Sequence, residues 1–171
     1  CCTVRGDLIR ILSGLMKRAD QLDAIIVETT GLADPAPVAQ TFFVDQDVAD
    51  RTKLDAIVTI ADAVHLDQQL GEHHEAEEQI AFADIVLLNK TDLVKGVNLE
   101  DVQTRIRKIN PYAEIIKTAH CKAPLDQVLG LDAFSLDRVL EIEPDFLESD
   151  HDHEHDDDVT SLSFISEAPL D

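Results

Sequence analysis

The chain has 171 residues, 44% of them hydrophobic, which is enough for one α/β domain with its own core and at most part of a second domain. Its 35 acidic residues outnumber 14 basic ones, so the formal net charge is -21 at pH 7. Such a surface repels phosphate backbones and anionic lipid headgroups. The composition therefore argues against binding to nucleic acids or membrane surfaces and favours a cationic ligand, above all a metal ion.

Neither secretion nor membrane insertion is indicated by the residue pattern. No apolar run approaches the ~20 residues that a membrane helix needs, and no signal-peptide pattern opens the chain. The three cysteines are Cys1, Cys2 and Cys121, which do not form the even framework of a disulfide scaffold. We therefore expect a cytoplasmic protein.

The first third of the chain predicts a helix, a strand and a second helix. Apolar residues recur on one stripe between residues 6 and 19, which indicates an amphipathic helix. A short apolar run at residues 24–28 predicts a buried strand, and a Thr-Thr-Gly turn follows it. Pro35 suits the first turn of a helix that continues to residue 43. The chain does not open with Met although its first residues are already patterned, so we expect the natural protein to extend upstream.

The same alternation of apolar runs and helical patterns continues through the middle of the chain. The expected elements are a strand at 56–60, a helical stretch to 82, a strand at 85–88, a helix at 99–109 and a strand at 115–118. This order predicts an α/β fold with a parallel sheet covered by helices on both faces. Ligands of such sheets bind at the carboxyl ends of the strands. Polar residues stand at these ends: Glu28, Asp62, Asn89 and Thr118.

The composition changes after residue 143. An acidic and histidine-rich run follows, which contains His151, His153 and His155 and offers almost nothing to bury. We interpret residues 1–143 as the main domain and residues 144–158 as a linker. Residues 159–165 alternate like a strand, so 159–171 are expected to begin a second domain.

The strongest motif is the tetrapeptide Asn-Lys-Thr-Asp at residues 89–92, directly after a predicted strand. Guanine presents adjacent N1–H and N2–H donors, and the carboxylate of Asp92 can accept both. Asn89 can bind the base or tie neighbouring loops together, while the aliphatic stem of Lys90 can lie over the purine face. The motif therefore predicts a guanine nucleotide, with weaker contacts expected from Thr118 and Ala119.

A second motif, Glu-Thr-Thr-Gly at residues 28–31, ends the strand predicted at 24–28. From this position Glu28 can hold a Mg2+-bound water, and the backbone N–H of Gly31 can approach a terminal phosphate. Alone, the motif would equally fit a capped strand end and a tight turn. The chain contains no G-x-x-x-x-G-K-[ST] phosphate loop, so we expect these 171 residues alone to be inactive in GTP hydrolysis.

Three motifs in order resemble the CobW-type GTPases, the family that includes zinc chaperones. They are CCTVRGDL at residues 1–8, ETTGLADP at 28–35 and NKTD at 89–92. The resemblance implies a P-loop NTPase-type fold whose first strand and phosphate loop lie upstream of Cys1. It also implies that Cys1 and Cys2 are the second and third thiolates of a metal site, and thiolates suit Zn2+.

The function implied by this resemblance is a metallochaperone that couples hydrolysis of GTP, with Mg2+, to delivery of Zn2+ to a client metalloprotein. The histidines of the linker would collect metal loosely, and a homo-oligomer is compatible with the pattern. His73 and His74 are better explained as an ordinary polar helix start. Two alternatives stay open: a nickel- or cobalt-handling GTPase for metalloenzyme or cobalamin assembly, and a non-catalytic metal-buffering domain.

Overall fold

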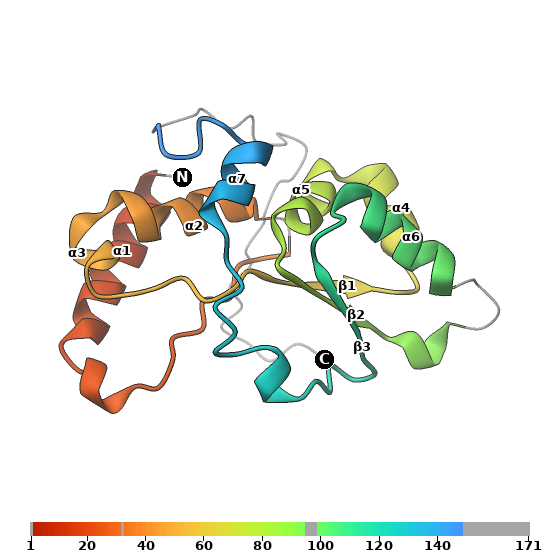
Figure 1. The fold of residues 1–171 in the computed structure, drawn as a ribbon, viewed down its shortest axis with the longest axis horizontal. Helices are drawn as coiled ribbons and strands as arrows, with labels where there is room; N and C mark the ends of the chain where they lie inside the picture. The colour runs from red at the N-terminus through yellow and green to blue at the C-terminus, as the bar shows by residue number, and fades with distance from the viewer. Residues whose placement is uncertain (1, 32, 95–98, 149–171) are drawn as a thin grey trace, which may run out of the picture.

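The computed structural model describes residues 2–31, 33–94 and 99–148, the first four of them by backbone alone (Figure 1). Its elements alternate between helices and short strands, with 3-10 helices labelled η. In chain order they are α1 Cys2–Met16, η1 Ala19–Gln21, α2 Pro35–Val44, α3 Gln46–Ala49, β1 Val58–Asp62, α4 Leu66–Glu72, α5 His74–Phe82, β2 Ile85–Asn89, η2 Thr91–Leu93, α6 Leu99–Ile109, β3 Glu114–Lys117, η3 Leu125–Gln127 and α7 Leu136–Ile142.

The three strands form a parallel sheet in the order β1-β2-β3, which confirms the predicted α/β fold. The register places Asp62 opposite Asn89 and Leu88 opposite Lys117. All five residues of the central strand β2 are buried, as a continuous apolar run predicts. The carboxyl ends of the strands therefore lie side by side at one edge of the sheet.

One face of the sheet packs against α4, α5 and α6, which lie together beside the strands (Figure 1). The buried residues of this core are Ala61, Ala63, Leu66, Ile80, Ala83, Val86, Leu88, Val102, Ile106 and Ala113. A second cluster joins α2, the end of α5 and α7, and it contains Phe82, Val139 and Phe146. Burying these side chains supplies the main stabilisation of the domain.

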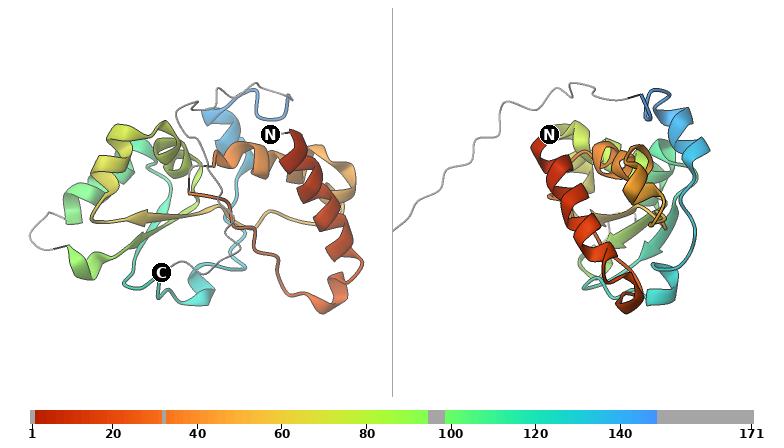
Figure 2. Two further views of the ribbon diagram at one scale, coloured as in Figure 1. Left: turned by 180° about the vertical axis from the view of Figure 1, so that it is seen from behind. Right: turned by 90° about the vertical axis from the view of Figure 1, so that its left-hand side faces the viewer.

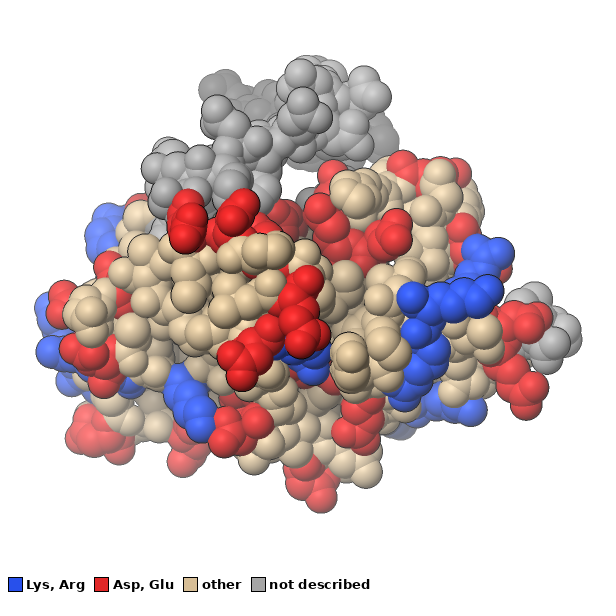
Figure 3. Space-filling model, turned by 45° about the horizontal axis from the view of Figure 1, so that its top comes forward, with Lys and Arg blue, Asp and Glu red and all other residues tan. Residues whose placement is uncertain are grey.

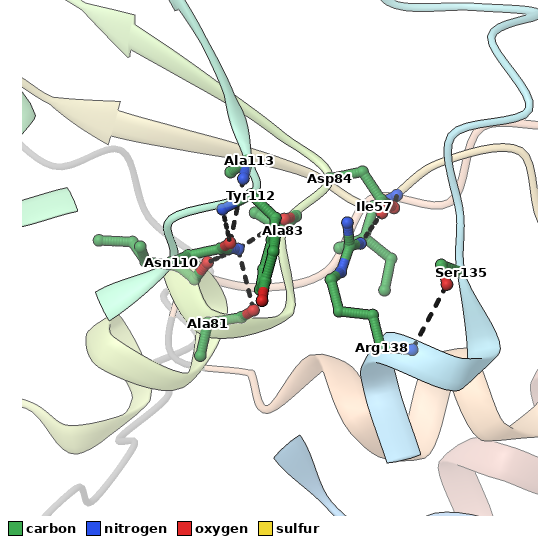
Figure 4. Close-up of polar contacts among 10 residues, drawn as sticks. Ile57, Ala81, Ala83, Asp84, Asn110, Tyr112, Ala113, Ser135 and Arg138 are labelled. Carbon is green, nitrogen blue, oxygen red and sulfur yellow. Dashed lines mark hydrogen bonds and ion pairs between the residues drawn. The ribbon is translucent and has the colours of Figure 1, made fainter. Parts of the chain in front are cut away.

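Two buried polar side chains fasten the loops at the amino end of the sheet (Figure 4). Asn110 donates to the carbonyls of Ile80, Ala81 and Ala83 and accepts from two backbone N–H groups of its own loop. Asp84 accepts from the backbone N–H of Ile57 and pairs with Arg138 of α7. Burial raises the pKa of Asp84 despite the opposing effect of these two partners. The hydrogen bonds of Asn110 and Asp84 thus fix the positions of loops that apolar packing alone would not fix.

The predicted amphipathic helix and the helix at Pro35 are both present. α1 begins at Cys2 and ends at Met16, a few residues earlier than predicted, and it packs against α2 and α3 (Figure 2). α2 begins at Pro35, where the carboxylate of Asp34 accepts from the backbone N–H of Ala36 at 2.8 Å. This side-chain cap and the N-terminal proline explain why the helix starts there.

The strand predicted at residues 24–28 is wrong: the segment is extended, but it joins no ladder in the described structure. A cavity of about 1020 Å³ lies between this segment and β1, lined by Ile26 and Glu28 on one side and Ile60 on the other. Ile26 is 76% exposed and Ile60 is 61% exposed. The predicted cover of helices on both faces is therefore incomplete in the described structure, since α4, α5 and α6 pack against one face whereas Ile60 of β1 is exposed.

Other elements also differ from the predictions: β1 begins two residues later than the strand predicted at 56–60, and β3 begins one residue earlier than the strand predicted at 115–118. The helical stretch before Phe82 is divided at His73 into α4 and α5, and α7 was not predicted. Phe146 is only 1% exposed, and its carbonyl accepts from the side chain of Gln40 at 2.6 Å. The packed domain thus extends beyond the boundary predicted at 143, while residues 149–171 lie outside the described residues.

Acidic side chains are spread widely over the face shown in Figure 3, and the basic ones lie mainly toward its margins. This distribution agrees with the formal net charge of -21 for the whole chain. Among the helices that the structure describes, none is long and apolar enough to span a membrane.

Candidate functional site

Three loops meet at the carboxyl edge of the sheet. They follow β1 at residues 62–65, β2 at 89–93 and β3 at 118–121. The parallel register brings them together, and hydrogen bonds between their side chains and backbones then connect each loop to the next. The predicted nucleotide residues Asn89, Lys90, Asp92, Thr118 and Ala119 all lie in this group of loops.

Asn89 connects the second loop to the third. Its Oδ1 accepts from the hydroxyl of Thr118 at 3.2 Å and from the backbone N–H of Cys121 at 2.9 Å. The side chain is buried with the residue only 8% exposed. Of the two roles that the sequence left open for Asn89, the structure therefore supports the tying of neighbouring loops.

The third loop is held from its backbone as well. The carbonyl of Thr118 accepts from both the backbone N–H and the hydroxyl of Thr91, at 3.2 and 2.9 Å. Thr118 is 3% exposed, whereas Ala119 is only partly buried. His120 and Cys121 both adopt positive φ angles, 54° and 52°, so the chain turns sharply just beyond Ala119.

Lys90 connects the second loop to the first. Its backbone is left-handed, with φ 63° and ψ 28°, and its Nζ donates to Oδ2 of Asp62 at 2.7 Å. Asp62 also accepts from Nδ1 of His65 at 3.0 Å and from the backbone N–H of Val64 at 2.9 Å. Lys90 is thus fixed at both ends, by its backbone and by its ammonium group.

These hydrogen bonds shift the pKa values of Asp62 and Lys90. Burial by itself would raise the pKa of Asp62, but the hydrogen bonds from Lys90, His65 and Val64 outweigh it and hold the pKa well below its ordinary value. The hydrogen bond to Asp62 also raises the pKa of Lys90. The pair is therefore ionised throughout the neutral pH range.

Asp92 lies at the open side of the same loops. Its side chain is 41% exposed, and its nearest ionic neighbour is Nε2 of His120, 4.0 Å from Oδ2. At that distance the imidazole makes no hydrogen bond that would block the carboxylate. Asp92 is therefore in a position to accept donors from a ligand.

Glu28 and Gly31 lie apart from this group, in the segment that lines the cavity beside β1. Both are exposed, and a Cβ placed on Gly31 would meet no atom within 4 Å. Gln79 of α5 reaches across to this turn and donates to the carbonyls of Gly31 and Ala33 at 3.1 and 2.8 Å. The turn is thus held from α5 and not from the edge of the sheet.

The predicted metal ligands cannot be placed together. Cys1, His151, His153 and His155 lie outside the described residues, and of Cys2 only its backbone position, at the start of α1, is described. Within the part of the chain that is described, no group of three His, Cys, Asp or Glu residues could hold a metal ion. His74 pairs with Glu78 of its own helix, with Nε2 and Oε1 3.3 Å apart.

Sequence reasoning missed the roles of two residues. The sequence placed Asp62 at a strand end without assigning it a role, and Gln79 was not singled out. For Asp62 a signal was available, because a carboxylate at the carboxyl end of one parallel strand lies at the same edge of the sheet as a motif that ends the neighbouring strand. For Gln79 there was none, since its contacts join residues 46 and 48 positions apart.

Comparisons with known proteins agree on one family. A family described as "CobW/HypB/UreG, nucleotide-binding domain" matches residues 1–117. The zinc-regulated GTPase metalloprotein activator 1 of Schizosaccharomyces pombe is 38% identical over 145 residues, covering 84% of this chain and 35% of the relative. The zinc chaperone YjiA of Escherichia coli is 32% identical over 151 residues, covering 85% of this chain and 47% of the relative.

The fold is shared as well. A crystal structure of the Zn(II)-bound YjiA GTPase from E. coli superposes with a TM-score of 0.65 at 34% identity, covering 75% of this chain and 40% of that one. The chain spans less than half the length of these relatives. With three motifs in order and most of the chain matched, the protein belongs to the CobW/HypB/UreG nucleotide-binding domain family.

Proposed function

We propose that this chain is the guanine-binding part of a GTPase that delivers a zinc ion to a client metalloprotein. The observation that carries the proposal is the joining of Asn89, Lys90 and Thr118 into one group of loops with Asp92 at its open side. The relatives' names, a zinc-regulated GTPase metalloprotein activator and a zinc chaperone, support the same function. The nucleotide-binding domain would end a few residues beyond 143, because Phe146 packs into its second cluster, with the histidine-rich run to 158 as linker and 159–171 opening a second domain.

The chemistry of the loops suits guanine. Asp92 offers a carboxylate whose two oxygens match the adjacent N1–H and N2–H of the base, and adenine lacks that pair of donors. The methylene stem of Lys90 provides an apolar surface for the purine face. Thr118 and Ala119 would border the base from the third loop, which Asn89 holds in place.

The phosphate end would lie toward the segment that contains Glu28 and Gly31. We assign Glu28 to a Mg2+-bound water and the backbone of Gly31 to the terminal phosphate. Open space around Gly31 agrees with this role, because nothing in the described protein occupies it. Gln79 would then link the position of the turn to α5.

The zinc ion is the cargo of the proposed reaction. Cys1 and Cys2 would supply thiolates, and His151, His153 and His155 would collect metal on an acidic linker. A formal net charge of -21 raises the local concentration of cations around such ligands. We further propose that the protein works in the cytoplasm, since three cysteines do not make a disulfide framework, and a homo-oligomer is compatible with this function.

The proposal is tested by the zinc affinity of the full-length protein, measured by competition with a chromophoric chelator in saturating GTP and again in GDP. We expect the dissociation constant to differ at least five-fold between the two nucleotides, as coupled sites typically do. A Cys2→Ser variant should lose tight zinc binding and keep GTP affinity. Equal zinc affinities in GTP and GDP would contradict the coupled function and would favour a metal-buffering domain.

A further inference from the structure

The carboxylate of Asp62 ends the strand next to the nucleotide motif and is already engaged with that motif. It is the last residue of β1, directly opposite Asn89. Its side chain is only 16% exposed, and it accepts from Lys90, His65 and the backbone of Val64. Both carboxylate oxygens are thus occupied by donors from the protein itself. A Mg2+ ion would have to compete with Lys90 for Oδ2, so the geometry favours a structural partner over a metal ligand.

Lys90 is held on both sides by its neighbours in the chain. Asn89 is buried and bonded to Thr118 and Cys121, and Thr91 is bonded twice to the carbonyl of Thr118. The left-handed backbone of Lys90 directs its side chain from this fixed point toward β1. The methylene stem of Lys90 therefore runs between two fixed points, its own backbone and the ammonium group that donates to Asp62.

An unrestrained lysine has many rotamers, and fixing one costs free energy when a ligand binds. If the rotamer of Lys90 is already fixed in the folded protein, the free-energy cost of fixing it is part of folding and does not weaken ligand binding. The ion pair is half exposed on the lysine side, so its own contribution to stability is modest. Its larger consequence would lie in the shape of the binding site.

We propose that Asp62 is a positioning residue for guanine nucleotides, because it fixes the stem of Lys90 in place for the purine face before the nucleotide arrives. The inference rests on the proposed nucleotide site. Asp62 itself touches neither the base nor the phosphates. Its effect should therefore be equal for GTP and GDP and should leave the choice of base, made by Asp92, unchanged.

The test is a double-mutant cycle in the full-length protein between Asp62→Asn and Lys90→Met, with GTP and GDP affinities measured by displacement of a fluorescent GDP analogue. Asn is isosteric with Asp but carries no charge for Lys90, and Met keeps an unbranched apolar stem without the ammonium group. We expect Asp62→Asn to weaken both nucleotides about three- to ten-fold, the value for one long side chain immobilised on binding. It should raise the KM for GTP and leave kcat unchanged.

The cycle distinguishes positioning from a merely structural role. In the Lys90→Met background, Asp62→Asn should have no further effect on affinity, since its partner is already gone. Asp67→Asn is the matched control, because it breaks another surface ion pair, with Arg105, at 3.2 Å. An equal loss with and without Lys90, or a loss of thermal stability with unchanged affinity, would overturn the positioning role. Failure of the wild-type protein to prefer GTP to ATP would instead overturn the nucleotide site itself.

Discussion

The two ends of the candidate nucleotide site differ in how the chain holds them. The base end, formed by the loops after β2 and β3, is fixed by Asn89, Thr91 and Lys90 through hydrogen bonds across strands. The proposed phosphate end, residues 24–31, joins no strand in the described part of the chain and borders a cavity of about 1020 Å³. The side chain of Gln79 donates a hydrogen bond to the carbonyl of Gly31 in this segment. A preformed base site gives specificity at little ordering cost, whereas a loosely held phosphate site can change position with the nucleotide.

The largest expected effect concerns base choice at the fixed end. Asp92→Asn should weaken GTP binding by roughly 10- to 100-fold, the value of a lost bidentate contact. An amide accepts from N1–H and donates to a 2-oxo group, so the variant should gain affinity for xanthosine triphosphate. Competition against a fluorescent nucleotide measures both. The control is Asp47→Asn, an exposed carboxylate of α3. Unchanged preference for GTP in Asp92→Asn would contradict the role of this carboxylate.

A second variant would loosen the base end itself. Asn89→Ala should lower the free energy of unfolding by about 2 kcal/mol, because it leaves the backbone N–H of Cys121 and the hydroxyl of Thr118 without their acceptor. Urea unfolding provides the measurement. Gln46→Ala, which removes an exposed hydrogen bond to Asp50, should cost less than about 0.5 kcal/mol. Equal costs for the two variants would show that Asn89 does not tie the loops.

The acid stability of the base end depends on Asp62. Its pKa is lower in the folded protein than the value of about 3.9 in an unfolded chain. The stabilisation is therefore complete above about pH 5 and is lost as the pH falls through the unfolded value toward the folded pKa. Asp62→Asn should lower stability at pH 7, and this deficit should shrink in acid. Urea midpoints between pH 3 and 7 measure it, and a deficit that does not vary with pH would contradict the lowered pKa.

The smallest effect concerns the phosphate end. Gln79→Ala removes two side-chain hydrogen bonds to the turn, and we expect amide exchange in residues 29–34 to become roughly three-fold faster, equivalent to about 0.6 kcal/mol. Hydrogen exchange followed by mass spectrometry resolves this segment. Gln103→Ala, whose amide bonds within its own helix, is the matched control. If exchange in 29–34 is unchanged, Gln79 does not hold the turn.

The sequence predicted those parts of the fold whose pattern is local. Buried runs such as 85–88 and the helix at 99–109 were found almost to the residue, because apolar periodicity and strand length identify them. The segment 24–28 has the same apolar character, but a strand also needs a partner along its edge, and no described strand lies beside it. α7 was missed because its seven residues carry a short pattern that depends on packing Val139 in the second cluster.

The residues of the candidate site also divide into those that a local motif predicts and those that only the tertiary fold brings together. The tetrapeptide motif that follows the strand predicted at 85–88 was enough to identify Asn89, Lys90 and Asp92, since their chemistry depends on a local sequence. The partners that hold them, Asp62 and the backbone of Cys121, come from other loops, and only the parallel register brings them near. The metal residues stay predictions, because they lie outside the described side chains.

The most direct test of the account is amide hydrogen exchange of the full-length protein with and without GDP. We predict strong protection of residues 89–93 and 118–122 on GDP binding, with none on addition of ATP at the same concentration. Protection confined to other segments, or equal protection by ATP, would contradict a guanine site formed by the loops after β2 and β3.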